Sequence, residues 1–221
     1  MTTLRQQISE FQQKMLPNMP EEVLEIMLQS TKELTNSGIA TRALQAGAQA
    51  PRFTLSDSNG TPVSLDELLA KGAVVINFYR GSWCPYCRLE LAALDQIMLE
   101  MHAMGATLIS ISPNQPKKTA EFTADNPLSF AMLSDPNLKV AEQYGIVFDM
   151  AKKLIPVYQK LGIELPAFDG NNDWRLPIPA TYIVRSNGTI AHAFIDPDYT
   201  RRMEPVDILD ILARPDNRAQ K

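Results

Sequence analysis

Apolar residues recur at intervals of three or four along the first part of the chain, which is the spacing of one face of a helix. A first set lies between residues 2 and 16, and a second set follows Pro20 and runs toward Gly38. The two sets predict two helices, which form an N-terminal arm over residues 1–46. Their apolar faces need a surface to pack on, either the body of the same chain or a partner subunit, and the second arrangement would make a homodimer.

Beyond the arm, short β-rich runs alternate with helical runs. The expected strands lie at residues 50–55, 74–79, 107–112, 130–133, 179–184 and 189–195, and the expected helices after 84, at 116–125, after 136, at 150–161 and at 206–212. Strands followed by helices predict parallel pairs, whereas the turn at Asn187 and Gly188 predicts an antiparallel hairpin. We therefore expect an α/β domain over residues 47–213, with a central mixed β-sheet flanked by helices, and a flexible tail over residues 214–221.

The only two cysteines of the chain, Cys84 and Cys87, stand three positions apart between the strand at 74–79 and the helix that follows it. Free N–H groups and the dipole of a helix N-terminus favour a thiolate over a thiol, and two thiols at this spacing can close into a disulfide. Pro85 suits the first turn of a helix, because its missing N–H costs nothing there. The stretch predicts a redox-active dithiol.

The residues around the dithiol suggest supporting roles. Trp83 is expected to cover the dithiol while leaving one sulfur accessible to substrate. Arg80 is close enough in sequence to hold a thiolate or a substrate oxygen, although an ordinary solvated turn residue is an equal alternative. Five charged residues from Asp196 to Glu204, among them Arg201 and Arg202, are expected to form surface ion pairs beside a capped helix.

A cysteine pair has two other common uses besides redox chemistry. A zinc site needs about four ligands, and the chain offers only His102 and His192 in addition, both far away in sequence. Two inert core cysteines are the second alternative. A CxxC motif beside an α/β pattern is the usual mark of a thioredoxin-like redox site, so we expect neither a metal nor another cofactor.

Composition limits the partners and the location. The chain has 221 residues, a net charge of −4 and a hydrophobic fraction of 45%, which suits one domain with an extension and gives no basic face for nucleic acid. No run approaches the ~20 apolar residues of a membrane span, and the N-terminus lacks the apolar core of a signal peptide. We therefore expect no membrane association and a cytoplasmic location, where cysteines are catalytic or redox-sensing more often than structural.

Four motifs, at residues 50–55, 78–87, 133–136 and 179–182, resemble the alkyl-hydroperoxide-reductase and thiol-specific-antioxidant family, in its peroxiredoxin-like branch that carries CxxC. The resemblance covers about residues 47–213 and leaves the arm outside. It implies a thioredoxin-like fold and a thiol-dependent antioxidant enzyme that reduces hydrogen peroxide or organic hydroperoxides. Thioredoxin, or glutathione with glutaredoxin, would be the reductant.

The order of attack is where the resemblance and this sequence disagree. Peroxiredoxins typically have a proline after the Phe-Tyr pair and a threonine or serine three residues before the attacking cysteine; Arg80, Cys84 and Cys87 occupy those three positions here. The sequence of residues 84–87 is also that of the glutaredoxin active site. We favour Cys84 as the attacking residue, because it is nearer the helix terminus and the first cysteine of such a motif is usually the more exposed.

The step from Ile178 to Pro179 resembles the cis-proline that lies against the dithiol in thioredoxin-like proteins. We expect this peptide bond to be cis and Pro179 to help bind substrate. Two other functions stay open at this point: a reductase of protein disulfides or glutathione mixed disulfides without peroxidase activity, and a redox-sensing interaction module whose arm binds a partner.

Overall fold

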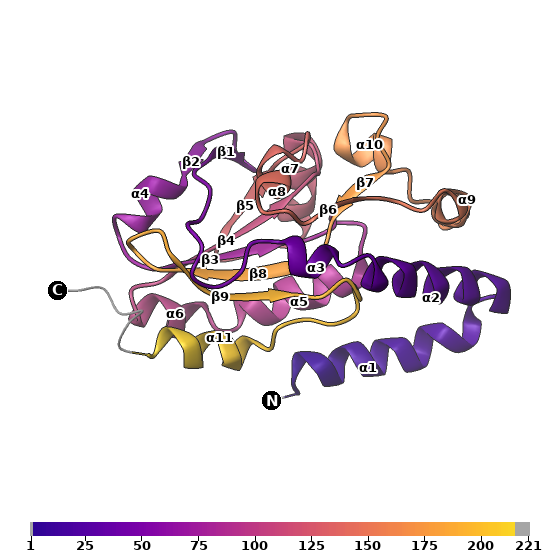
Figure 1. Cartoon of the computed structure of the whole chain (residues 1–221), viewed down its shortest axis with the longest axis horizontal. Coiled ribbons are helices and arrows are strands. Elements are labelled where there is room, and N and C mark those ends of the chain that lie inside the picture. The colour runs from indigo at the N-terminus through magenta and orange to yellow at the C-terminus, as the bar shows by residue number, and fades with distance from the viewer. Residues whose placement is uncertain (1, 215–221) are drawn as a thin grey trace.

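The computed structural model describes residues 2–214, and a seven-stranded mixed sheet forms its centre (Figure 1). The strand order is β2-β1-β5-β4-β3-β8-β9. The bounds are β1 Thr54–Asp57, β2 Pro62–Ser64, β3 Val74–Phe78, β4 Thr107–Ser112, β5 Ala131–Ser134, β8 Ala180–Val184 and β9 Ile190–Ile195. Because β3, β4 and β5 run parallel while β8 and β9 form an antiparallel hairpin, the predicted mixed sheet is confirmed.

Helices cover both faces of the sheet. The helices of the described residues are α1 Leu4–Met15, α2 Glu21–Asn36, α3 Ile39–Arg42, α4 Leu65–Leu69, α5 Pro85–Asp95, α6 Met98–Ala103, α7 Pro116–Asp125, α8 Lys139–Gln143, α9 Ile155–Lys160, α10 Leu165–Asp169 and α11 Pro205–Leu212, with short 3-10 turns at Leu16–Asn18 and Lys152–Leu154. One face packs against α5, α6, α11 and α1, and the other against α3, α4 and α8 (Figure 1). Along β3, Val75 faces the α5 side while Val74 and Ile76 face the other, which explains why this strand, buried on both faces, is apolar except at Asn77.

The arm packs on its own chain. Leu4 and Ile8 of α1 are buried with the core on the α5 side, and the Phe11 ring meets Tyr86 edge-on at 5.3 Å between centroids. The backbone N–H groups of Leu4 and Arg5 donate to the Glu204 carboxylate at 3.0 and 2.8 Å, so an acidic side chain from the other end of the chain caps α1. The apolar face of α1 is therefore buried on its own chain, whereas in α2 only Ser30 is buried.

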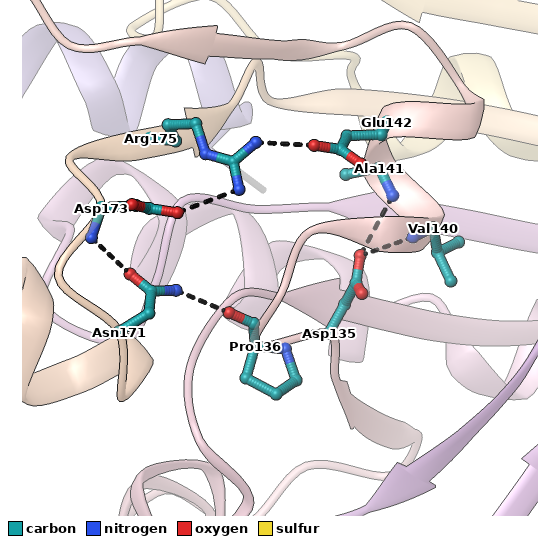
Figure 2. A network of polar contacts seen from close by, with 8 residues as sticks. All are labelled: Asp135, Pro136, Val140, Ala141, Glu142, Asn171, Asp173 and Arg175. Atoms are coloured by element: carbon teal, nitrogen blue, oxygen red, sulfur yellow. Dashed lines mark hydrogen bonds and ion pairs between the residues drawn. The ribbon is translucent and has the colours of Figure 1, made fainter.

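The segment from 162 to 179 holds α10 and a strand, β7 Arg175–Pro177, that pairs with β6 Val147–Asp149. The sequence did not predict this two-stranded sheet, because three-residue strands leave almost no periodic signal. Arg175 forms an ion pair with Glu142 of α8 at 2.6 Å, which connects the segment to that helix (Figure 2). It forms a second ion pair with Asp173, within the segment, at 3.1 Å. Asn171 donates to the carbonyl of Pro136 at 2.8 Å.

The division of the chain at residue 46 stays a prediction. The predicted tail lies outside the described residues apart from Arg214. No helix within residues 2–214 is long and apolar enough to cross a membrane.

Candidate active site

The dithiol lies where β3 ends and α5 begins, as the sequence predicted. Cys84 is the N-cap of α5, with extended backbone angles of φ −85° and ψ 115°, and Pro85 and Cys87 lie in the first turn. The backbone N–H of Cys84 donates to the carbonyl of Gly81 at 3.1 Å, which closes the turn that leads into the helix. Both sulfurs therefore lie at the positive end of a helix dipole.

Asn114, a fully buried residue after β4, holds this turn in place. Its side-chain oxygen accepts the backbone N–H of Ser82 at 2.8 Å, and its amide nitrogen donates to Asp169 of α10 at 3.0 Å. Gly81 adopts φ +146°, and a Cβ there would lie 2.4 Å from the indole nitrogen of Trp83. The turn consequently requires glycine at this position.

Both cysteines are free thiols and both are buried, at 1% exposure for Cys84 and 0% for Cys87. Burial raises the pKa of Cys84, but the hydrogen bond from the Cys87 thiol and the charges of Arg80 and Arg202 outweigh it and lower that pKa to about 5. Burial raises the pKa of Cys87, and the neighbouring Cys84 raises it further. The thiolate therefore resides on Cys84, although the exposure expected for that sulfur is not observed.

Arg202, expected on the surface, is instead buried beside the dithiol. Its Nη2 donates to the sulfur of Cys87 at 3.5 Å, and its Nε lies 3.4 Å from the carboxylate of Glu90. The side chains of Arg202 and Glu90 are 1% and 2% exposed. Only Arg201 makes the predicted kind of surface pair, with Asp196 at 3.2 Å.

Glu90 carried a signal that could have revealed this buried pair. It lies three residues after Cys87 and one before Leu91, on the buried face of α5, where a carboxylate needs a positive partner. Nothing local identified Arg202 as that partner, because 112 residues separate the two.

Arg80 is 4% exposed, so it is not a solvated turn residue. Its guanidinium carbon lies 5.0 Å from the ring centre of Trp83, 5.7 Å from that of Tyr158 and 4.4 Å from that of Tyr199. It also donates a hydrogen bond to the hydroxyl of Tyr158. The aromatic rings hold a positive charge at the dithiol.

A cavity of about 550 Å³ opens between the arm and the dithiol. We call it the arm groove; its lining includes Met19, Val23 and Met27 of the arm and Trp83, Cys84 and Leu161 of the body. Arg80, Tyr158 and Tyr199 line it as well. Cys84 thus has an approach for a small molecule even though its own exposure is close to zero, whereas Cys87 does not line the groove.

The peptide bond before Pro179 differs from the prediction. The Ile178–Pro179 bond is trans, so the prediction of a cis bond is wrong, and the argument for a substrate platform that rested on it lapses. Pro179 lines a separate cavity of about 160 Å³, which shares Met27, Arg80, Tyr158 and Tyr199 with the arm groove but is not lined by Cys84. Within residues 2–214, no cluster of three or more histidine, cysteine, aspartate or glutamate side chains is arranged to hold a metal ion.

Comparison with known proteins identifies the family. The sequence profile of the AhpC/TSA family matches residues 46–193 of this chain. The chain belongs to the AhpC/TSA family. The match begins at residue 46, so α1, α2 and α3 lie outside the part of this AhpC/TSA protein that matches the family profile.

Two curated relatives of this AhpC/TSA protein carry different names. The putative peroxiredoxin bcp of Haemophilus influenzae is 39% identical over 103 residues, which cover 47% of this chain and 66% of that protein. The thiol-disulfide oxidoreductase ResA of Halalkalibacterium halodurans is 37% identical over 109 residues, which cover 48% of this chain and 61% of that protein. The chain thus spans less than two thirds of the length of either relative.

Solved structures agree on the fold of this AhpC/TSA protein. The crystal structure of peroxidoxin BcpB from Mycobacterium tuberculosis superposes with a TM-score of 0.59 at 22% identity, covering 76% of this chain and 96% of that one. The predicted thioredoxin-like α/β fold is therefore confirmed.

Proposed function

We propose that this protein is a thiol peroxidase that reduces hydrogen peroxide and organic hydroperoxides with the Cys84–Cys87 dithiol. The observation that carries the proposal is the Cys84 sulfur, whose pKa of about 5 makes it a thiolate at neutral pH and which lines a cavity open to small molecules. Membership of the AhpC/TSA family and the 39% identity to a putative peroxiredoxin support the same reaction.

The reaction begins with attack of the Cys84 thiolate on the terminal oxygen of the hydroperoxide. The O–O bond breaks, a S–O bond forms, and the departing alkoxide takes up a proton and leaves as the alcohol, so Cys84 becomes a sulfenic acid. Arg80 and Arg202 place two positive charges around the site, and these stabilise the thiolate and the negative charge that develops on the departing oxygen.

Cys87 completes the cycle as the resolving residue. Its thiol loses a proton and attacks the Cys84 sulfur, the S–O bond breaks, and water leaves as the disulfide closes. An external dithiol then returns the pair to the reduced state by supplying two electrons. We propose thioredoxin, or glutathione with glutaredoxin, as that reductant, and a reducing compartment such as the cytoplasm as the location.

A disulfide reductase is the second candidate. It is favoured by the same low pKa of Cys84, since thiol–disulfide exchange needs chiefly a thiolate at the first position, and by the 37% identity to a thiol-disulfide oxidoreductase. The redox-sensing module, the third alternative, has less support, because the apolar face of α1, one of the two arm helices that a partner could bind, is buried on the chain itself.

Steady-state turnover separates the three functions. The protein is supplied with a thioredoxin or a glutathione system and with hydrogen peroxide, cumene hydroperoxide or a glutathione mixed disulfide. A peroxidase consumes reductant continuously with either peroxide, and the Cys84→Ser variant does not. Turnover with the mixed disulfide alone would establish the reductase instead, and a single oxidation without turnover would establish a sensor.

A further inference from the structure

The arm groove combines apolar walls with a polar inner end. Three methionines, Met15, Met19 and Met27, line it from the arm, and Val157 and Leu161 line it from α9 and the residue after it. Methionine side chains are flexible and polarizable, so such a surface adapts to apolar groups of irregular shape.

The polar end holds donors that no protein group uses. Arg80 Nε and Trp83 Nε1 are buried, and neither has a hydrogen-bond partner within residues 2–214. The indole nitrogen lies against Gly81, so what the groove offers a ligand at this end is the Arg80 cation beside the Cys84 sulfur, which suits a group with acceptor oxygens. A molecule that satisfies both ends of the groove has oxygen atoms at one end and an apolar group at the other.

We propose that the arm groove is a substrate subsite that binds the organic group of a bulky apolar hydroperoxide, aromatic or branched, while the peroxide oxygens face Arg80, Trp83 and Cys84. The inference rests on the proposed peroxidase function and deepens it. Hydrogen peroxide has no apolar group and gains nothing from the walls. The arm lies before residue 46, outside the part matched by the family profile, so this subsite is a property that the arm confers on this chain.

Two pairs of exposed or half-buried residues provide matched variants. Leu161 is 52% exposed and lines the groove, whereas Leu99 on α6 is 84% exposed and does not. In the arm, Val23 lines the groove, whereas Leu28, 62% exposed on the same helix, does not. Leu161→Gln and Val23→Gln are therefore the test variants, and Leu99→Gln and Leu28→Gln are their controls.

The test measures kcat/KM for cumene hydroperoxide and for hydrogen peroxide separately. We expect Leu161→Gln and Val23→Gln to lower kcat/KM for cumene hydroperoxide about 10-fold and to leave kcat/KM for hydrogen peroxide within about 2-fold of the wild type. The two control variants should match the wild type with both peroxides. Equal losses with both peroxides, or no loss with either, would overturn the subsite.

A second measurement keeps this result separate from the peroxidase proposal. Binding of 2-phenylpropan-2-ol, the alcohol formed from cumene hydroperoxide, is followed by equilibrium dialysis on the reduced protein. We expect it to weaken in Leu161→Gln and Val23→Gln and not in the controls. If the alcohol binds in this way and no peroxide is consumed, the peroxidase function fails and the apolar subsite stands. If the alcohol does not bind the wild type, or binds all variants alike, the subsite fails whatever the turnover.

Discussion

The guanidinium of Arg202 donates a hydrogen bond to the sulfur of Cys87 at 3.5 Å, although 115 residues separate the two in sequence. Arg202 lies in the segment between β9 and α11, which brings it to the buried side of α5. The same side chain pairs with Glu90, so one cation compensates a buried carboxylate and stabilises the dithiol in its charged form.

Replacing Arg202 by methionine should therefore have two effects. Glu90 loses its partner while still buried, which we expect to lower the free energy of unfolding by about 3–5 kcal/mol, the usual result of breaking a buried pair. The pKa of Cys84 should rise, because Arg202 is one of the charges that lower it. Chemical denaturation and the pH dependence of Cys84 alkylation measure the two effects.

Arg201→Met is the matched control, because Arg201 is 70% exposed and its pair with Asp196 lies at the surface. It should change stability by less than about 1 kcal/mol. The double variant Arg202→Met, Glu90→Gln should regain much of the lost stability, since no buried charge is left without a partner. If Arg201→Met proves as damaging as Arg202→Met, the buried pair does not have the role assigned to it.

The Asp169 carboxyl predicts how stability depends on pH. Burial raises its pKa to about 7, and the hydrogen bond from Asn114 opposes the shift only in part. Between about pH 4 and 7 the folded protein therefore keeps a proton on this carboxyl that the unfolded chain has released. The contribution of this group to the free energy of unfolding is fully present below about pH 4 and is lost as the pH rises through about 7. Asp169→Asn should remove a slope of up to about 1.4 kcal/mol per pH unit.

Denaturant titrations at several pH values between 4 and 8 measure that slope. Asp135, whose pKa burial raises to about 6 even though it accepts the N–H groups of Val140 and Ala141 (Figure 2), adds a slope of the same sign that the variant retains. An unchanged pH profile in Asp169→Asn would show that the carboxyl is already ionised in the folded protein.

The close contact between Gly81 and Trp83 predicts that a larger residue at position 81 lowers both stability and turnover. In Gly81→Ala the new Cβ meets the indole at 2.4 Å in a backbone conformation that alanine rarely adopts. We expect a loss of about 1–3 kcal/mol in stability, together with a drop in turnover, because Trp83 would have to leave its place beside Cys84.

The variant Gly47→Ala separates the effect of backbone strain from the effect of the clash with Trp83. Gly47 also has a positive φ, +94°, but a Cβ there would have no heavy atom within 4 Å. Thermal unfolding and peroxide turnover of the two variants can be compared directly. A turnover in Gly81→Ala equal to that in Gly47→Ala would remove Trp83 from the account of the site.

The sequence was sufficient for the parts of the site that are local. The strand, turn and helix around Cys84 follow from an apolar run, a glycine and a proline placed at the first helical turn, and each of these acts within a few residues. The parallel and mixed pairing of the sheet followed from alternating strands and helices. The packing of the arm on its own chain was one of two alternatives that periodicity alone left open.

The features of the site that the sequence did not predict depend on contacts between segments that are distant in sequence. The charged neighbours of Arg202 predict a surface residue, and no sequence pattern links Asn114 or Asp169 to the turn at Ser82. The cis bond predicted before Pro179 was carried over from a resemblance, and the local sequence at that position held no independent argument for it.

The most direct test of the account is to identify the cysteine that peroxide oxidises first. Reduced Cys84→Ser and Cys87→Ser are each treated with one equivalent of hydrogen peroxide in the presence of dimedone, and the adducts are located by mass spectrometry of the peptides. The account predicts a sulfenic acid adduct on Cys84 in Cys87→Ser and none on Cys87 in Cys84→Ser, because the low pKa and the arm groove both belong to Cys84. An adduct on Cys87 in Cys84→Ser, with none on Cys84 in Cys87→Ser, would contradict it and establish the order of attack implied by peroxiredoxin spacing.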